Sequence, residues 1–60
     1  MAQLLTVDDV AARLAIHRMT VYQLIWAGHI AWVNVAVGKR PRIRIEEAEI
    51  DRFIKQRTQR

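Results

Sequence analysis

The sequence predicts a mainly α-helical fold with a two-stranded β-hairpin, in the order helix, turn, helix, hairpin, helix. Apolar residues recur with the period of a helix over residues 7–14, 18–27 and 47–57. Between the second and third of these segments the period changes to the alternation of strands, at residues 31–37 and 42–45. Since the chain has 60 residues and no cysteine, we expect one small domain, residues 1–60, whose core contains no disulfide.

The first helix is expected to begin after Thr6, a favourable N-cap residue, and Asp9 three residues later gives a weak capping box. Its apolar face consists of Val7, Val10, Ala11 and Leu14. Residues 15–17 form the turn, and we expect Ile16 to be buried between the two helices that the turn joins.

The second helix is expected to end before Gly28, because glycine adopts the left-handed C-cap conformation without penalty. Its inward stripe consists of Val21, Leu24 and Ile25. The third helix carries acidic residues at its start and basic residues at its end, an arrangement that the helix dipole favours. Its apolar face consists of Ile50, Phe53 and Ile54.

The hairpin follows from strict alternation on both of its strands. On the first strand Val33, Val35 and Val37 are expected to face the core. Residues 38–41 form the turn, in which Pro41 restricts the backbone. On the second strand the isoleucines at 43 and 45 are expected to face inward and the arginines at 42 and 44 outward. Such a hairpin is not stable alone, so it is expected to pack on the helices.

Positive charge is concentrated on this hairpin. The chain carries ten basic and six acidic residues, a net charge of +4. Four of the basic residues, Lys39, Arg40, Arg42 and Arg44, lie within residues 39–44. A charge run is usually only a solvated face, but this one follows a helix-turn-helix in sequence. The charge distribution therefore indicates a polyanionic partner.

The residue inventory argues against catalysis and bound cofactors. The chain has no serine, no cysteine and no glycine-rich phosphate loop, and Tyr22 lacks the surrounding cluster that a nucleophile requires. His17 and His29 are twelve positions apart, so we expect no metal site. No cofactor or small-molecule ligand is expected. Neither a membrane span nor a signal peptide is evident, so the expected location is the cytoplasm.

The ordered set of elements and residues resembles the small excisionase-like DNA-binding domains, related to the DNA-binding half of MerR-type regulators in the winged helix-turn-helix superfamily. The resemblance covers residues 4 to 54 and is carried by Leu5–Ala11, Leu14–Ile16, Arg18, Thr20–Tyr22, Leu24–Ile25, Gly28, Ile30, Val33, Val35, the basic segment 39–44, Ile45 and Ile50–Ile54. No single motif is diagnostic, but the ordered set is fairly specific.

The resemblance implies sequence-selective binding of double-stranded DNA, with the second helix in the major groove and the hairpin as a wing on the adjacent minor groove or backbone. Many members are recombination directionality factors of phages and mobile elements, which bend DNA and bias an integrase toward excision. Head-to-tail association of several copies on DNA is expected. The candidate DNA-binding residues are Arg18, Met19, Thr20, Tyr22, Gln23, Lys39, Arg40, Arg42 and Arg44.

Each candidate on the second helix has its own chemistry. Arg18 suits a guanine edge or a phosphate, and Gln23 suits adenine. Tyr22 suits a phosphate contact or half-buried packing against the wing. Met19 suits a thymine methyl or simple exposure, and Thr20 suits support of the turn or a phosphate contact.

The sequence departs from the family pattern at several positions. His17 stands where serine often caps the recognition helix, and Ala15 replaces a frequent turn glycine. Ala48 stands where a serine often caps the third helix, so Glu46 or Glu47 is expected to serve there. Trp26 and Asn34 occupy positions that are often basic. The long dimerisation helix of MerR-type regulators is missing, so a self-contained two-fold dimer is not expected.

Two alternative functions stay open. A small MerR-like transcription regulator needs the same fold and DNA-binding mode. A protein-interaction adaptor would instead use Trp26 and Trp32 as an exposed apolar patch and carry the basic hairpin for solubility. We favour packing of the two tryptophans on each other at the helix–wing junction.

Overall fold

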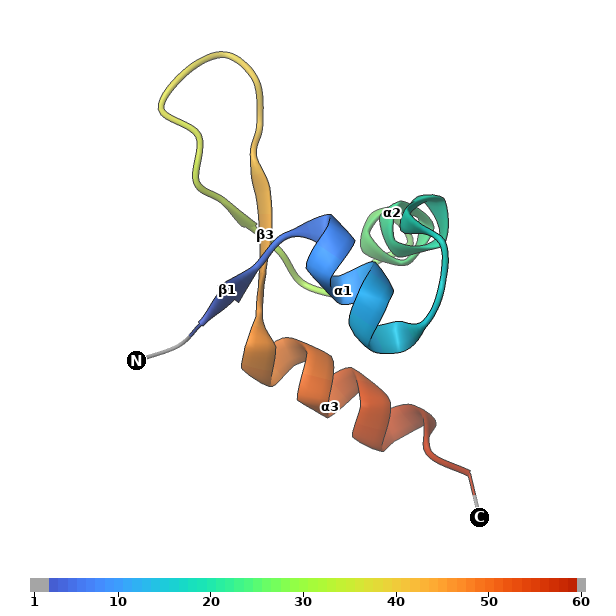
Figure 1. Ribbon diagram of the computed structural model, residues 1–60. Coiled ribbons are helices and arrows are strands. Elements are labelled where there is room, and N and C mark those ends of the chain that lie inside the picture. The colour runs from blue at the N-terminus through green and yellow to red at the C-terminus, as the bar shows by residue number, and fades with distance from the viewer. Residues whose placement is uncertain (1–2, 60) are drawn as a thin grey trace.

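Three helices and a short antiparallel sheet make up residues 3–59, the part of the chain that the computed structural model describes (Figure 1). Residues 1, 2 and 60 of the expected domain lie outside these residues. The elements in chain order are β1 (Leu4–Leu5), α1 (Val7–Leu14), α2 (Arg18–Trp26), β2 (Val33–Asn34), β3 (Ile43–Glu46) and α3 (Glu47–Arg57). The loop between β2 and β3 projects away from all three helices (Figure 1).

The capping box predicted at the start of α1 is confirmed. The Thr6 hydroxyl accepts a hydrogen bond from the backbone N–H of Asp9 at 3.0 Å, and the Asp9 carboxylate accepts one from the Thr6 N–H at 3.1 Å. These contacts satisfy donors that a helix N-terminus otherwise leaves unpaired. The Thr6 hydrogen bonds to the Asp9 carboxyl, followed by the nearby Arg13 and Arg44 charges, lower the pKa of this group.

The turn between α1 and α2 forms without glycine. Ala15 adopts a left-handed conformation with φ of 56°, and the following N–H of Ile16 bonds to the carbonyl of Ala11 at 3.0 Å. The His17 side chain then caps α2, since its Nδ1 accepts a hydrogen bond from the N–H of Met19 at 3.1 Å. Both departures from the family pattern are therefore accommodated locally, the first at the cost of a strained backbone.

The second helix ends one residue earlier than expected, at Trp26. Gly28 has φ of 84°, and the N–H of His29 bonds back to the carbonyl of Leu24 at 2.9 Å. This geometry confirms that Gly28 supplies the left-handed position that terminates the helix. The chain then turns so that Ile30 enters the core.

The sheet has three strands rather than the two that the sequence predicted. Its order is β1-β3-β2, with both pairs antiparallel. Leu5 lies opposite Ile45 in the β1–β3 pair, and Val33 lies opposite Arg44 in the β2–β3 pair. A two-residue strand such as β1 is too short to show alternation in the sequence. It forms by pairing with β3, which lies about forty residues later in the chain.

The core lies between the helices and the base of the sheet. Its buried side chains are Leu5, Val7, Val10, Val21, Ile25, Ile30, Ile45 and Ile50. The inward placement of Val33, Val35 and Val37 was wrong, since all three are exposed and Val37 is fully so. Beyond β2 the hairpin extends away from the helices (Figure 1). No apolar layer therefore packs against its alternating residues.

The third helix begins and ends where the sequence predicted. Glu46 occupies the N-cap position but makes no side-chain capping bond. The N–H of Glu47 instead donates to the carbonyl of Gln3 at 2.9 Å, and the Glu47 carboxylate pairs with Arg13 at 3.2 Å. The first turn of α3 is therefore held by the chain before β1 and by α1.

Candidate nucleic-acid interface

Three arginines line one hollow where α2 meets the base of the hairpin. The hollow has a volume of about 280 Å³. We call it the arginine hollow, and it is lined by Val7, Asp8, Arg18, Tyr22, Pro41, Arg42, Ile43 and Arg44. Arg18 comes from the first turn of α2. Arg44 lies on β3, and Arg42 lies in the loop immediately before that strand. The fold thus joins cations from both segments that the sequence singled out.

Each arginine of the hollow is held differently. Arg44 is half-buried, and its Nη1 donates to the carbonyl of Ile43 at 2.8 Å, so it does not project freely outward as expected. Arg42 is exposed, and its backbone N–H is held by the Asn34 side chain at 3.1 Å. Of the two arginines that alternation places on one face, Arg44 therefore has a guanidinium bonded to the backbone, whereas Arg42 is exposed.

Asp8 places a carboxylate inside the arginine hollow. Its Oδ1 lies 3.5 Å from Nε of Arg18, and both side chains are largely exposed. Such an exposed pair contributes little to stability. Its effect is to hold the Arg18 side chain beside the N-terminus of α1, and to reduce the positive charge that the hollow presents.

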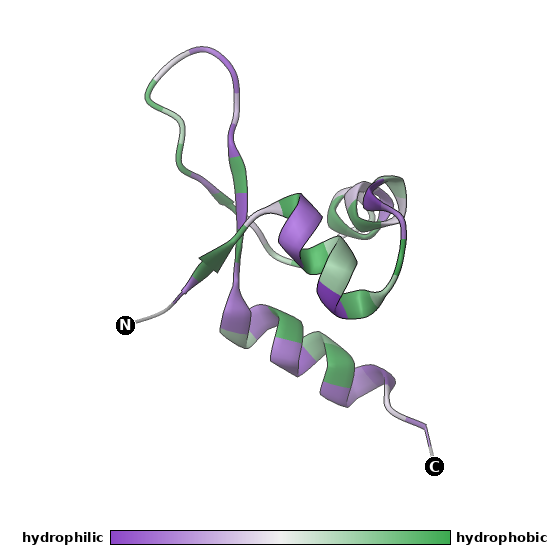
Figure 2. Cartoon of the chain, viewed as in Figure 1, coloured by the Kyte–Doolittle hydropathy of each residue, from purple (hydrophilic) through white to green (hydrophobic). Residues whose placement is uncertain are grey.

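The remaining hairpin cations lie farther out. Lys39 and Arg40 line a second concavity, on the loop, together with Val37 and Gly38, and Arg42 lines both this concavity and the arginine hollow. In Figure 2 the limb of the loop that leaves β2 is coloured as hydrophobic, and the limb that enters β3 is mostly hydrophilic. The structure therefore brings Arg42 and Arg44 to the helices but leaves Lys39 and Arg40 near the loop tip.

Asn34 fixes how the loop leaves the sheet. Its Oδ1 accepts hydrogen bonds from the N–H of Ala36 at 3.0 Å and of Arg42 at 3.1 Å, and Val35 N donates to the carbonyl of Arg42 at 3.0 Å. One amide oxygen thus joins both limbs of the hairpin. Sequence reasoning missed this role, although asparagine at a strand end commonly bonds to nearby backbone.

The outer face of α2 carries two of the predicted residues. Met19 and Gln23 are exposed and one turn apart, and Trp26 continues the same face. Thr20 does not join them, since it lines an apolar hollow between α2 and α3 with Leu24 and Phe53. Thr20 is therefore placed away from the arginine hollow.

Trp26 stacks on Tyr22, its neighbour one turn earlier. Their ring centroids are 5.3 Å apart and the ring planes are inclined by 25°. The expected packing of Trp26 on Trp32 is wrong, because Trp32 instead lines a hollow with Glu46, Glu49 and other residues near the start of α3. Helical spacing between Tyr22 and Trp26 was the signal that could have identified the stack.

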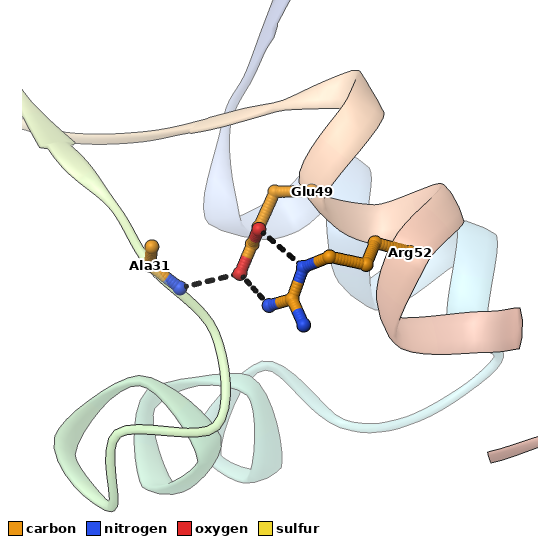
Figure 3. A network of polar contacts seen from close by, with 3 residues as sticks. All are labelled: Ala31, Glu49 and Arg52. Atoms are coloured by element: carbon orange, nitrogen blue, oxygen red, sulfur yellow. Dashed lines mark hydrogen bonds and ion pairs between the residues drawn. The ribbon is translucent and has the colours of Figure 1, made fainter. Parts of the chain in front are cut away.

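A polar network secures the segment that follows α2 (Figure 3). The Glu49 carboxylate accepts a hydrogen bond from the N–H of Ala31 at 2.9 Å and bonds to Arg52 at 2.6 and 3.0 Å. The Arg52 side chain, and then the Ala31 N–H, lower the pKa of Glu49. The pair of Glu49 and Arg52 therefore holds α3 against the chain leading into the hairpin.

Neither a metal cluster nor a membrane helix is found within residues 3–59. No group of three or more potential ligands is arranged to hold a metal ion, and His17 is engaged as a helix cap. None of the helices there has the length and apolar character needed to cross a bilayer.

Comparison with known proteins gave one family. The model of a helix-turn-helix domain matches residues 4–58, nearly the whole chain. No curated protein and no solved structure matched. The matched span includes both helices of the turn, the entire hairpin and all of α3.

Proposed function

We propose that this chain, which belongs to the helix-turn-helix domain family, is a DNA-binding and DNA-bending accessory factor that acts as an excisionase. In this proposal it binds double-stranded DNA beside a phage-type integrase and directs recombination toward excision. It acts in the cytoplasm of a bacterial host and performs no chemical step itself. The observation that carries the DNA-binding part is the arginine hollow, where cations of α2 and the hairpin meet.

The shape of this surface suits a duplex better than a small anion. The arginines come from two elements, and the hairpin loop extends away from the helices (Figure 1). We propose that α2 enters the major groove, with Gln23 and Met19 facing the base edges. Arg18, Arg42 and Arg44 then contact phosphates, while Lys39 and Arg40 act as a wing on the adjacent groove.

The bending and assembly parts rest on the area that one domain can cover. A single small module typically buries about 600–1,000 Å² on DNA, so its affinity is limited. We therefore propose that several copies bind adjacent direct repeats head-to-tail. Their combined contacts would offset the elastic cost of bending the duplex.

The charge test removes the two hairpin arginines of the hollow. Arg42→Ala with Arg44→Ala should abolish binding in a gel shift, because both phosphate contacts are lost. The matched control is Lys55→Ala with Arg57→Ala, which removes the same charge from the last turn of α3. The control should retain binding apart from a small general decrease. Equal loss in both doubles would show that only net charge matters and would contradict the role of the hollow.

A second test separates excision control from transcriptional regulation. Footprints over attachment-site DNA, with and without the integrase, should give a cooperative ladder over direct repeats and a change in recombination direction. A single protected palindrome near a promoter, with no effect on the integrase, would instead assign the chain to transcriptional regulation. A duplex that is never retained, while the chain is captured by a protein, would favour an adaptor.

A further inference from the structure

We propose that Trp26 contacts DNA, packing its indole against the apolar groups on the wall of the groove that α2 enters. These groups are the deoxyribose carbons and the thymine methyl. The inference rests on the proposed DNA binding of α2 and adds a residue whose chemistry is apolar rather than ionic. It also assigns a role to a large side chain that does not pack into the core.

The exposure of Trp26 is the first observation. Its side chain is 69% exposed, although it belongs to a helix whose opposite face is fully buried at Val21. Most of its surface is apolar, so leaving it in water is unfavourable. Helical spacing places it on the outer face of α2 with Met19 and Gln23.

The stack on Tyr22 is the second observation. With centroids 5.3 Å apart and an inclination of 25°, the Tyr22 ring supports one face of the indole and leaves the other open. Tyr22 itself is half-buried and lines the arginine hollow. The indole is therefore held in place before any partner arrives, which reduces the entropy lost on binding.

Continuity with the arginine hollow identifies the occupant as DNA. From the hollow the surface passes over Tyr22 directly to Trp26. A polyanion seated on the arginines would run alongside the indole, whereas an apolar protein segment there would have to desolvate several charges. Trp32 lies in a different hollow beside α3, so the two tryptophans do not form one apolar patch.

Duplex geometry limits what the indole can touch. Bases in a duplex are already stacked, so an aromatic ring outside them meets groove edges rather than base faces. Thymine presents its methyl in the major groove, and each nucleotide presents sugar carbons along the groove wall. The indole N–H can also donate to a phosphate oxygen. All of these contacts are favourable without adding charge.

The chain allows a direct spectroscopic test, because it contains only two tryptophans. Trp32→Phe leaves Trp26 as the sole reporter, and Trp26→Phe leaves Trp32. Each is titrated with a mixed-sequence duplex of about 20 bp at low salt, long enough for the helix and the hairpin to be engaged. Binding is followed in parallel by anisotropy of a label on the DNA.

The emission of Trp26 should change and saturate together with the anisotropy, while the emission of Trp32 should change little. Binding by anisotropy with no change at Trp26 would overturn the inference and leave the proposed function intact. A change at Trp32 alone would also overturn it. Failure of every variant and of the unsubstituted chain to bind would overturn the proposed function and the inference together.

An affinity arm distinguishes contact from a structural role. Trp26→Ala should weaken binding about tenfold, Trp26→Phe should retain most of the affinity, and Trp32→Ala serves as the matched control. Since Trp26 carries no charge, its loss should leave the slope of affinity against salt unchanged. A melting temperature equal to that of the unsubstituted chain excludes misfolding, and a changed slope would contradict the apolar contact.

Binding to modified DNA identifies which group of the DNA contacts Trp26. If the thymine methyl is the partner of Trp26, replacing thymine by uracil should weaken binding by the unsubstituted chain more than binding by Trp26→Ala, in which only Met19 of α2 remains to contact that methyl. Equal binding to both duplexes by the unsubstituted chain, with the loss at Trp26→Ala retained, assigns the contact to the sugars. Equal affinities of Trp26→Ala and the unsubstituted chain for both duplexes would overturn the inference.

Discussion

At the scale of single residues, Glu49 shows how one side chain joins segments that are distant in sequence. Its carboxylate accepts hydrogen bonds from Ala31 and Arg52 (Figure 3). The spacing of Glu49 and Arg52 could have been read as a local pair on a helix. The bond to Ala31 could not, because nothing local places that N–H beside α3. The pairing of Asp8 with Arg18 and the bond of Asn34 to Arg42 were missed for the same reason.

Glu49→Gln should lower the free energy of unfolding by about 1 kcal/mol at neutral pH, since the charge-assisted bonds to Arg52 and Ala31 are weakened. Because the folded-state pKa of Glu49 is lowered, its stabilising effect is fully present above the ordinary glutamate pKa of about 4.3. The effect is lost as the pH falls through the lowered pKa of the folded protein. Denaturant unfolding at neutral and acidic pH measures this difference.

Asp51→Asn is the control, because Asp51 is an exposed acidic residue of the same helix. It should change stability by a few tenths of a kcal/mol at most. A difference between Glu49→Gln and the unsubstituted chain that persists unchanged in strong acid would show that the carboxylate charge is not responsible.

At the scale of elements, the helices could be predicted from the sequence, whereas the sheet could be predicted only in part. The apolar period and the caps of α1 depend on neighbours within a few residues, so Thr6 and Asp9 were sufficient to place its start. The alternation of Val33, Val35 and Val37 suggested a buried face that does not exist. A two-residue period indicates that the two faces of a strand differ, but it does not indicate that another element packs on the apolar face.

The turn between α1 and α2 offers a prediction at this scale. Ala15→Gly should stabilise the protein by about 0.5–1 kcal/mol, because relief of the left-handed strain outweighs the added entropy of the unfolded chain. In a domain of this size that corresponds to a rise in Tm of roughly 2–8 °C. Thermal unfolding followed by circular dichroism measures it.

Ala12→Gly provides the opposite control, since Ala12 is an exposed residue within α1. Glycine there should destabilise the protein by about 1 kcal/mol. If both glycine variants lower the Tm, the positive φ at Ala15 is not a source of strain.

At the scale of the whole molecule, the charge arrangement matters more than its sum. The net charge of +4 suggested a polyanionic partner from sequence alone. The sequence did not show that Arg18 lies in one hollow with Arg42 and Arg44. These residues are more than twenty positions apart in the chain, so only the fold brings them together. The sequence also did not separate Thr20 from the other α2 candidates.

Binding to a duplex should depend strongly on salt. If about four to six phosphates are neutralised, a plot of log affinity against log salt should have a slope of about −4 to −5. Arg42→Ala with Arg44→Ala, measured at salt low enough to retain residual binding, should make the slope less steep by about two. Fluorescence anisotropy over a series of salt concentrations measures both slopes. A flat response would contradict phosphate contact by the hairpin.

The loop between β2 and β3 has a consequence for how such a protein can diversify. None of its side chains enters the core, and a Cβ at Gly38 would meet no neighbouring atom. Substitutions, and even changes of length, are therefore compatible with an unchanged folded body as long as Asn34 still joins the two limbs. We expect natural variants of this architecture to differ most in that loop, where new specificities can arise without loss of foldability.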